Sequence, residues 1–259
     1  MNTKSEALVL HTLKYGDSRL IVDMFTREHG RLSFAVPAPQ SPRSKLKKQY
    51  FQPLTLLYIE ADIRPSQQLH RLKDASLLTP LPSLLSDAQK LAIALFVAEF
   101  LYHALRDEQR NEPLFDYVRS SIEWLDGRKD RFANFHLVFL MHLSRFLGFF
   151  PNLSLPISNE QLVISNYDYS HGGSEATGYY FDLRAATFCA DPPLHRDYLL
   201  PDEASRIVTM MRMDYATMHL FRLSRADRNR ILDIIEQYYR LHLPSLPELR
   251  SLPVLRELF

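Results

Sequence analysis

The densest group of residues that could do chemistry in this sequence is a basic run from Arg43 to Lys48. Its cations are Arg43, Lys45, Lys47 and Lys48, and the aromatic residues Tyr50 and Phe51 follow directly. Clusters of this kind attract phosphate backbones, because each phosphate that a cation neutralises releases condensed counterions. Neighbouring aromatic rings can stack on unpaired bases, which contributes about 1–3 kcal/mol per base. The run therefore indicates a nucleic-acid contact, although a solvated loop between two strands would have the same composition.

The net charge of +1 conceals an uneven distribution of charge along the chain. Residues 1–80 contain 12 Lys and Arg against 7 Asp and Glu, whereas residues 81–259 contain 19 against 23. A basic first part indicates that a polyanion binds there. The residues predicted to contact phosphate are Arg31, Arg43, Lys45, Lys47 and Lys48, with Arg19 and Lys14 as secondary candidates.

Signatures of catalysis are missing from the sequence. It has no Gly-x-Ser-x-Gly elbow, no phosphate-binding Gly-x-x-x-x-Gly-Lys loop and no His-Glu-x-x-His motif. The single cysteine, Cys189, can supply neither an internal disulfide nor the thiolates of a zinc site, and we expect it to be a half-buried apolar residue. We therefore predict that the protein is not an enzyme and needs no metal or cofactor. A hydrolase with an unrecognised set of residues is the enzymatic alternative.

Two groups of residues resemble metal ligands only superficially. His136 and His142 lie on one predicted helix, but six residues apart they face different sides of it. The segment from Asp168 to His171 contains one carboxylate and one imidazole followed by two glycines, and it is more typical of a hairpin turn.

The first 80 residues have the pattern of short strands joined by turns. Leu32, Phe34 and Val36 alternate with smaller or polar residues, which is the period of a half-buried strand. Strands are predicted at 7–10, 19–26, 31–36, 54–59 and 67–73. Five short strands in about 75 residues suit a barrel of the oligonucleotide-binding (OB) type, and a five-stranded SH3-like barrel fits nearly as well.

From residue 83 onward the sequence changes to helical periodicity. Ser86 and Gln89 resemble a capping box before the apolar stretch 91–105. Further helices are predicted at 111–125, 130–148, 202–213 and 224–243 from their caps and stop signals. Residues 151–200 resemble an irregular excursion with a hairpin at 161–183. We therefore predict an α+β protein with an OB-fold nucleic-acid-binding domain at 1–80 and an α-helical bundle domain with this irregular insert at 81–259.

A second group of cations lies on or just before the helix predicted at 130–148. Its members are Arg128, Arg131 and Arg145, and the helix also carries apolar residues at helical spacing. A basic rim beside an apolar pocket could hold an acidic peptide tail with a hydrophobic end. Ordinary solvation of a helix face would explain the same residues.

Several segments are informative as a set, because they occur in one order over nearly the whole chain. They are Ala7–Val22, Phe25–Phe34, Leu46–Leu57, Arg145–Leu153, Tyr238–Leu243 and Arg250–Leu255. Together they resemble the RecO family of bacterial recombination mediators. The resemblance implies a barrel that binds single- and double-stranded DNA and anneals strands. It also implies a complex with RecR, capture of the acidic tail of the single-stranded-DNA-binding protein, and loading of RecA onto gapped DNA.

Two departures from the family pattern bear on these expectations. The family often has a glycine followed by basic residues where this chain has Val36–Pro39, which leaves open which cations contact DNA. Many relatives also carry four cysteines in the excursion where this chain has only Cys189, so it resembles a zinc-free branch.

Location and partner class complete the expectations. The chain has no apolar stretch of about 20 residues and no signal-peptide pattern at its start, so we expect a cytoplasmic, nucleoid-associated protein. The alternative to a DNA-binding mediator is an adaptor whose barrel binds protein. The sequence does not decide the oligomeric state or the preference for single or double strands.

Overall fold

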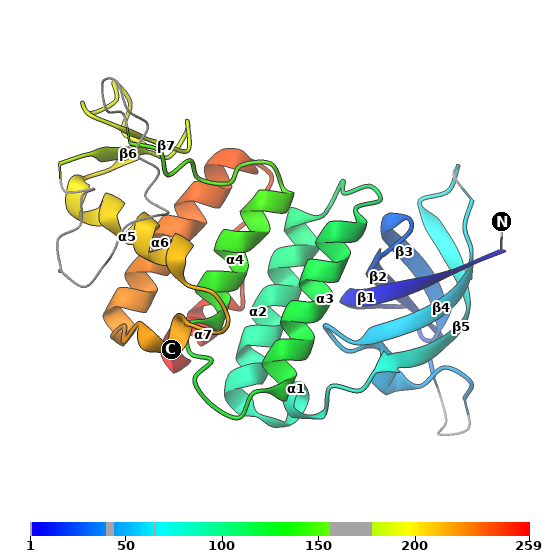
Figure 1. Ribbon diagram of the computed structural model, residues 1–259. Helices are drawn as coiled ribbons and strands as arrows, with labels where there is room; N and C mark the ends of the chain where they lie inside the picture. Colours follow the sequence, from blue (N-terminus) through cyan, green and yellow to red (C-terminus); the bar gives the residue numbers. More distant parts are fainter. Residues whose placement is uncertain (1, 40–43, 65, 156–177) are drawn as a thin grey trace. The chain divides into compact units, whose positions relative to one another are not determined.

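The structure is a computed structural model that describes residues 2–39, 44–64, 66–155 and 178–259. The chain forms two compact units, whose elements are labelled in Figure 1. The first unit comprises the described residues up to Lys129 together with Pro247–Leu258, and the second comprises those of Asp130–Leu246 with Phe259. The predicted domain boundary after residue 80 stays a prediction.

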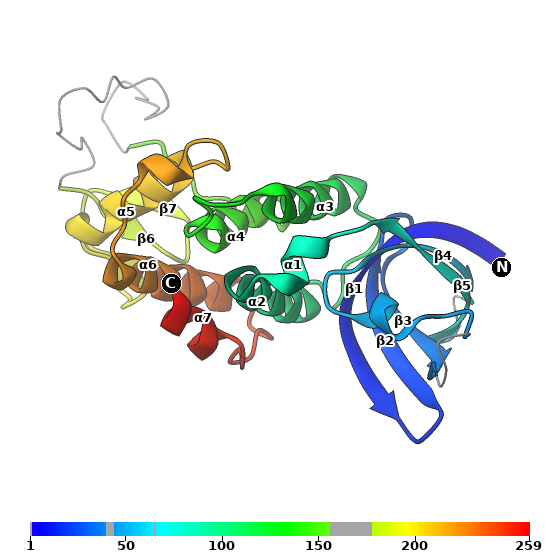
Figure 2. The same ribbon diagram turned by 90° about the horizontal axis from the view of Figure 1, so that it is seen from below.

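Five strands of the first unit close into a barrel. They are β1 (Asn2–Tyr15), β2 (Arg19–Thr26), β3 (Gly30–Pro37), β4 (Leu56–Asp62) and β5 (Leu69–Thr79). Strand β1 pairs antiparallel with both β2 and β4, and the parallel pairing of β3 with β5 completes the ring (Figure 2). This arrangement is OB-like, so the predicted α+β class with a leading OB barrel is confirmed.

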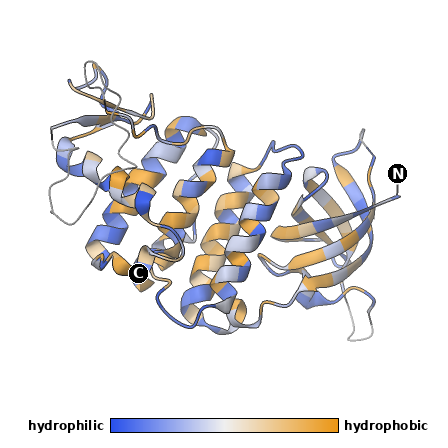
Figure 3. Cartoon of the chain, viewed as in Figure 1, coloured by the Kyte–Doolittle hydropathy of each residue, from blue (hydrophilic) through white to orange (hydrophobic). Residues whose placement is uncertain are grey.

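Alternation along each strand decides which residues fill the barrel. On β3, Phe34 and Val36 are completely buried in the barrel core, whereas Ala35 between them faces outward. Figure 3 shows the resulting mixture of apolar and polar residues along the strands. A short 3-10 helix, η1 (Lys48–Phe51), buries Phe51 against the same core. Each large side chain buried in this way contributes about 1.5–3 kcal/mol to stability.

Four helices complete the first unit. They are α1 (Pro82–Ser86), α2 (Ala88–Ala104), α3 (Glu112–Gly127) and α7 (Leu252–Leu258). The carboxylate of Asp87 accepts hydrogen bonds from the first backbone N–H groups of α2, so the capping box predicted from Ser86 is wrong. Asn111 caps α3 as predicted, because its side chain accepts a hydrogen bond of 3.1 Å from the N–H of Leu114.

The approach to α7 is held on α2 by one carboxylate. Glu99 accepts hydrogen bonds from the backbone N–H groups of Arg250 and Ser251, at 2.9 and 2.8 Å, and from the Ser251 hydroxyl. Burial opposes the charge of Glu99, but these hydrogen bonds outweigh it and hold its pKa below the usual value. A segment far along the chain is thereby fixed to α2.

The second unit contains three longer helices and a small sheet. Helix α4 (Phe135–Phe146) packs against α5 (Pro201–Arg212) and α6 (Arg225–His242), and the 3-10 helix η3 (Met218–Leu220) precedes α6. Helix α6 begins with a capping box between Ser224 and Asp227, as expected for a helix at 224–243. The hydroxyl of Tyr239 donates a 2.6 Å hydrogen bond to the carbonyl of Leu140, which ties α6 to α4.

Two predictions about the second unit need correction. Helix α4 begins at Phe135 rather than at residue 130, because Arg131 has a φ of 60° that a helix cannot contain. The stretch 151–200 is not irregular throughout, since β6 (Tyr180–Asp182) pairs with β7 (Thr187–Cys189) and β8 (Tyr198–Leu199). Most of the hairpin predicted at 161–183, and all of Asp168–His171, lie outside the described residues.

Within the described ranges, no helix combines the length and the apolar character needed to cross a membrane.

Candidate nucleic-acid interface

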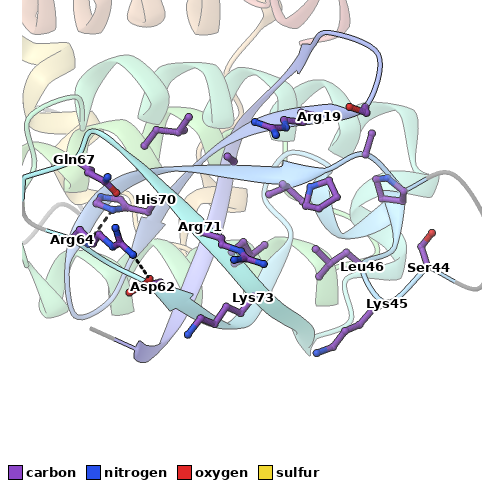
Figure 4. Close-up of a pocket in the computed structure, with 18 residues that line it drawn as sticks. Arg19, Ser44, Lys45, Leu46, Asp62, Arg64, Gln67, His70, Arg71 and Lys73 are labelled. Carbon is purple, nitrogen blue, oxygen red and sulfur yellow. Dashed lines mark hydrogen bonds and ion pairs between the residues drawn. The ribbon is translucent and has the colours of Figure 1, made fainter.

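The outer face of the barrel carries a groove whose charged side chains are mostly basic. The groove has a volume of about 1120 Å³ and lies over the beginning of β2, the end of β3 and the first half of β5. Among the described residues that line it, the cations are Arg19, Lys45, Arg64, Arg71 and Lys73, and the one carboxylate is Asp62. Figure 4 shows that these side chains come from several elements around one hollow. OB folds bind oligonucleotides on this kind of surface, next to the β1–β2 and β4–β5 loops.

Strand register explains why residues far apart in sequence meet here. Ile21 of β2 pairs with Ala35 of β3, which pairs with Arg71 of β5. Directly paired residues point to the same face of a sheet, so Arg71 lies on the outer face that Ala35 occupies. Residues Leu69, Arg71 and Lys73 alternate with the buried His70 and Leu72, which places all three outward.

Two weak ion pairs lie at the groove. The Nζ of Lys45 is 2.9 Å from the Oδ2 of Asp74, and the Nη2 of Arg64 is 3.4 Å from the Oδ2 of Asp62. The side chains of Lys45 and Arg64 are 69% and 61% exposed, and pairs in such surroundings contribute only about 0–1 kcal/mol. A phosphate group could therefore take over either cation at little cost.

His70 lies buried at the floor of the groove. Its Nδ1 accepts a long hydrogen bond of 3.4 Å from the backbone N–H of Arg64, at the beginning of the β4–β5 loop. Burial, with a smaller effect of His29, lowers the pKa of His70, while Asp62 acts in the opposite direction. The ring is neutral at pH 7, so the positive charge of the groove comes from its Lys and Arg side chains.

The structure brings only some of the predicted cations to this groove. Arg19 and Lys45 line it, whereas Lys14, Lys47 and Lys48 are exposed on the barrel without lining it. Arg43 lies outside the described residues. The predicted DNA contacts themselves stay predictions.

Arg31 occupies a different environment from the other predicted cations. Its side chain is only 12% exposed, its Nη2 is 3.5 Å from the Oδ1 of Asp23, and its guanidinium lies 4.5 Å from the ring centre of Tyr102 on α2. Its backbone N–H donates to the carbonyl of Glu108 in the loop after α2. These contacts assign Arg31 to the packing of the barrel on α2, so we leave it out of the candidate interface.

The two aromatic residues that follow the basic run pack on the barrel core. Phe51 is 4% exposed in the barrel core, and Tyr50 packs against the same cluster. The expectation that Phe51 would stack on a base is therefore wrong, because it fills the barrel core, whereas for the partly buried Tyr50 it stays a prediction.

Sequence reasoning missed Arg64, Arg71 and Lys73. It searched for cations that are dense in sequence, whereas these three are separated by apolar and polar residues. A usable signal was present, since Arg71 and Lys73 stand two residues apart in a predicted strand and must share a face.

The three arginines of the predicted peptide-binding rim do not belong to one unit. Arg128 lies in the first unit, where its guanidinium is 4.6 Å from the ring centre of Trp124. Arg131 and Arg145 lie in the second, where Arg145 lies 4.4 Å from the ring centre of Phe150. A role for these residues in protein binding stays a prediction.

The remaining candidates for chemistry are structural. Cys189 is half-buried in β7 as expected, and burial raises the pKa of its thiol. His136 is completely buried, which lowers its pKa to about 3, and His142 shares a 3.1 Å hydrogen bond with the carbonyl of Met213. Across the described residues, no group of three or more His, Cys, Asp and Glu side chains could hold a metal ion.

Comparisons with known proteins cover almost the whole chain. The family model described as "Recombination protein O N terminal" matches residues 1–81, and "Recombination protein O C terminal" matches residues 85–253. A protein named DNA repair protein RecO from Bacteroides fragilis is 51% identical over 260 residues, covering 100% of both chains. Proteins of the same name from Phocaeicola vulgatus and Porphyromonas gingivalis are 49% and 34% identical, covering 100% and 98% of both chains.

Proposed function

Because the chain belongs to the RecO family of DNA repair proteins, we propose that it is a non-enzymatic recombination mediator whose barrel binds the DNA backbone. The groove on the outer face of the barrel supports this proposal most directly. The described part of its lining has five cations against one carboxylate, and that carboxylate is already paired with Arg64. A phosphate backbone is the ligand that suits such a surface, because its binding releases counterions.

The finer steps of the proposed role follow from the family. The protein would bind single and double strands, anneal complementary strands and act with RecR to load RecA onto DNA coated with single-stranded-DNA-binding protein. Arg128, Arg131 and Arg145 are the candidate contacts for the acidic tail of that coating protein. None of these steps makes or breaks a covalent bond, so the role needs no catalytic residues.

Salt-dependent binding tests the proposal. We would measure the fluorescence anisotropy of a labelled single-stranded oligonucleotide over a range of salt concentrations with the unmodified protein and with an Arg71→Glu/Lys73→Glu variant. The slope of log K against log salt should fall by about 0.7 for each phosphate contact that is lost, and so by about 1.4 for this variant. A Lys4→Glu/Lys129→Glu variant has the same change in net charge at two exposed positions that do not line the groove, and its slope should not change.

The basic run gives a second set of variants for the same assay. Charge reversal at Lys45, Lys47 and Lys48 should lower the slope by about 0.7 for each of them that contacts phosphate. An unchanged slope would remove this segment from the interface. A complete lack of binding by the unmodified protein at low salt would favour the protein-binding adaptor instead.

A further inference from the structure

The groove supplies cations but almost no surface on which a base could stack. Among the aromatic residues of the barrel, Phe25, Phe34 and Phe51 are buried and Tyr50 packs on the core. Leu69, 41% exposed, is the largest exposed apolar side chain among the described residues that line the groove. A ring for stacking must therefore come from beside the groove.

Tyr15, at the end of β1, lies next to the groove. It pairs directly with Arg19, and Arg19 in turn pairs with Pro37 of β3. Arg19 and Pro37 both line the groove. Since paired residues share a face and their Cβ atoms are about 4.5–5.5 Å apart, Tyr15 continues this row beyond Arg19 on the outer face.

The side chain of Tyr15 is free to receive a ligand. The residue is 61% exposed, and none of the described residues stacks on it or forms a hydrogen bond with its side chain. Leu13, two residues earlier on the same face, is also half exposed and pairs with Ile21. The outer face of the β1–β2 hairpin is thus an aromatic and aliphatic surface that borders a basic groove.

We propose that Tyr15 is a base-stacking platform at the rim of this groove and gives the barrel a preference for unpaired over paired strands. The inference rests on the proposed function, because it needs the groove to hold a DNA backbone. Arg19 would hold a phosphate while the adjacent ring accepts the face of a base. In a duplex both faces of an internal base are already covered by its neighbours, so only a single strand gains from the ring.

The experiment compares strands that have the same phosphates with and without bases. The probes are a fluorescein-labelled oligothymidylate of about 16 nucleotides, the upper end of the site size of an OB fold, and an abasic strand of the same length. Tyr15→Ala should bind the oligothymidylate about 5- to 150-fold more weakly than the unmodified protein, which is a loss of about 1–3 kcal/mol for one stacked base. It should bind the abasic strand with unchanged affinity. Tyr15→Phe keeps the ring and should bind both strands normally.

Tyr58 provides the matched control. It is the other exposed tyrosine of the barrel, at 44%, and it pairs with Glu6 and Ser76, which do not line the groove. Tyr58→Ala should change neither affinity, and circular dichroism should confirm that all variants are folded.

The outcomes separate this inference from the proposed function. Equal binding of oligothymidylate by Tyr15→Ala and the unmodified protein would overturn the stacking role while leaving the groove in place. So would an equal loss on both strands, since that would mean a contact with the backbone. If the unmodified protein binds neither strand at low salt, the proposed function fails and the stacking role fails with it.

Discussion

Replacing Arg31 by methionine would separate a structural arginine from those that bind DNA. Methionine keeps an unbranched apolar side chain but removes the guanidinium that lies between Asp23 and Tyr102. After the change, the carboxylate of Asp23, whose side chain is 9% exposed, would retain the Ser33 hydroxyl and His11, whose Nδ1 is 3.5 Å away. The variant should therefore lose stability without losing a phosphate contact.

The magnitude follows from burial. Removing one partner of a buried ion pair costs about 3–5 kcal/mol when the remaining charge has no other partner, and less here because Asp23 keeps Ser33 and His11. The contact with the ring of Tyr102 contributes about 0.5–2 kcal/mol more, depending on how far it is desolvated. The two contacts together should therefore account for a loss of about 3–5 kcal/mol, which is a large part of the 5–15 kcal/mol that is typical of a folded domain. Exposed residues such as Arg71, by contrast, change stability by about 0.5 kcal/mol or less.

Two measurements on Arg31→Met and Arg71→Met give opposite patterns. Urea unfolding followed by the fluorescence of Trp124, the single tryptophan, reports the stability of the first unit, in which α3 carries this residue. Arg31→Met should unfold at much lower urea and keep the salt slope of DNA binding. Arg71→Met should keep its stability and lose about 0.7 from the slope on single strands. If Arg31→Met were as stable as the unmodified protein and lost slope instead, the assignment of Arg31 to packing would be refuted.

Three further substitutions test the packing inside each unit. Gly30→Ala should lower the free energy of unfolding by more than the about 1–2 kcal/mol that a left-handed alanine costs. Gly30 has a φ of 70°, and a Cβ there would also lie 2.3 Å from a backbone oxygen. Gly16→Ala, at a φ of 64° with open space around it, should lose only the about 1–2 kcal/mol of backbone strain. Lys90→Met should cost at least about 1.5–3 kcal/mol in urea unfolding, because Lys90 is 2% exposed and its ammonium donates to one hydroxyl and two carbonyl oxygens. A smaller loss would contradict this role. The pKa of His136 is about 3 in the folded state, so between pH 6.5 and 3 the unfolded state binds a proton that the folded state does not. The free energy of unfolding should therefore fall by up to about 1.4 kcal/mol per pH unit as the pH decreases towards 3. His136→Phe should remove this part of the slope in pH-dependent unfolding, Phe139→Leu should lower stability without changing the slope, and an unchanged slope in His136→Phe would contradict the assignment.

Much of the fold could be predicted because local pattern and tertiary pairing agree. The alternation of Leu32, Phe34 and Val36 predicted β3 to within one residue at each end, and both bounds of β2 were predicted correctly. Strand β1 was predicted as four residues and has fourteen, since it pairs with β4 in its first half and with β2 in its second. Its two ends carry exposed polar residues such as Lys4 and Lys14, so hydropathy alone could not show its length.

The candidate site was less predictable, because it is assembled by register rather than by sequence density. Arg31 and Arg71 both lie on strands of the barrel. Arg31 contacts Tyr102 of α2, whereas Arg71 lines the groove. That difference depends on where the helices cover the barrel, which no periodicity records. The direction of the charge imbalance could be predicted from composition, while the particular cations required the strand pairing.

The attachment of residues 247–258 to α2 has a consequence for the order in which the protein can mature. The first unit includes this late segment, yet the ribosome makes Asp130–Leu246 of the second unit before it. About 150 residues separate the end of α2 from the beginning of α7, so at roughly 5–20 residues per second the apolar surface of α2 that awaits α7 stays uncovered for about 7–30 s during synthesis. The barrel can close in that time, but Glu99 can accept its hydrogen bonds from Arg250 and Ser251 only after these residues have left the exit tunnel.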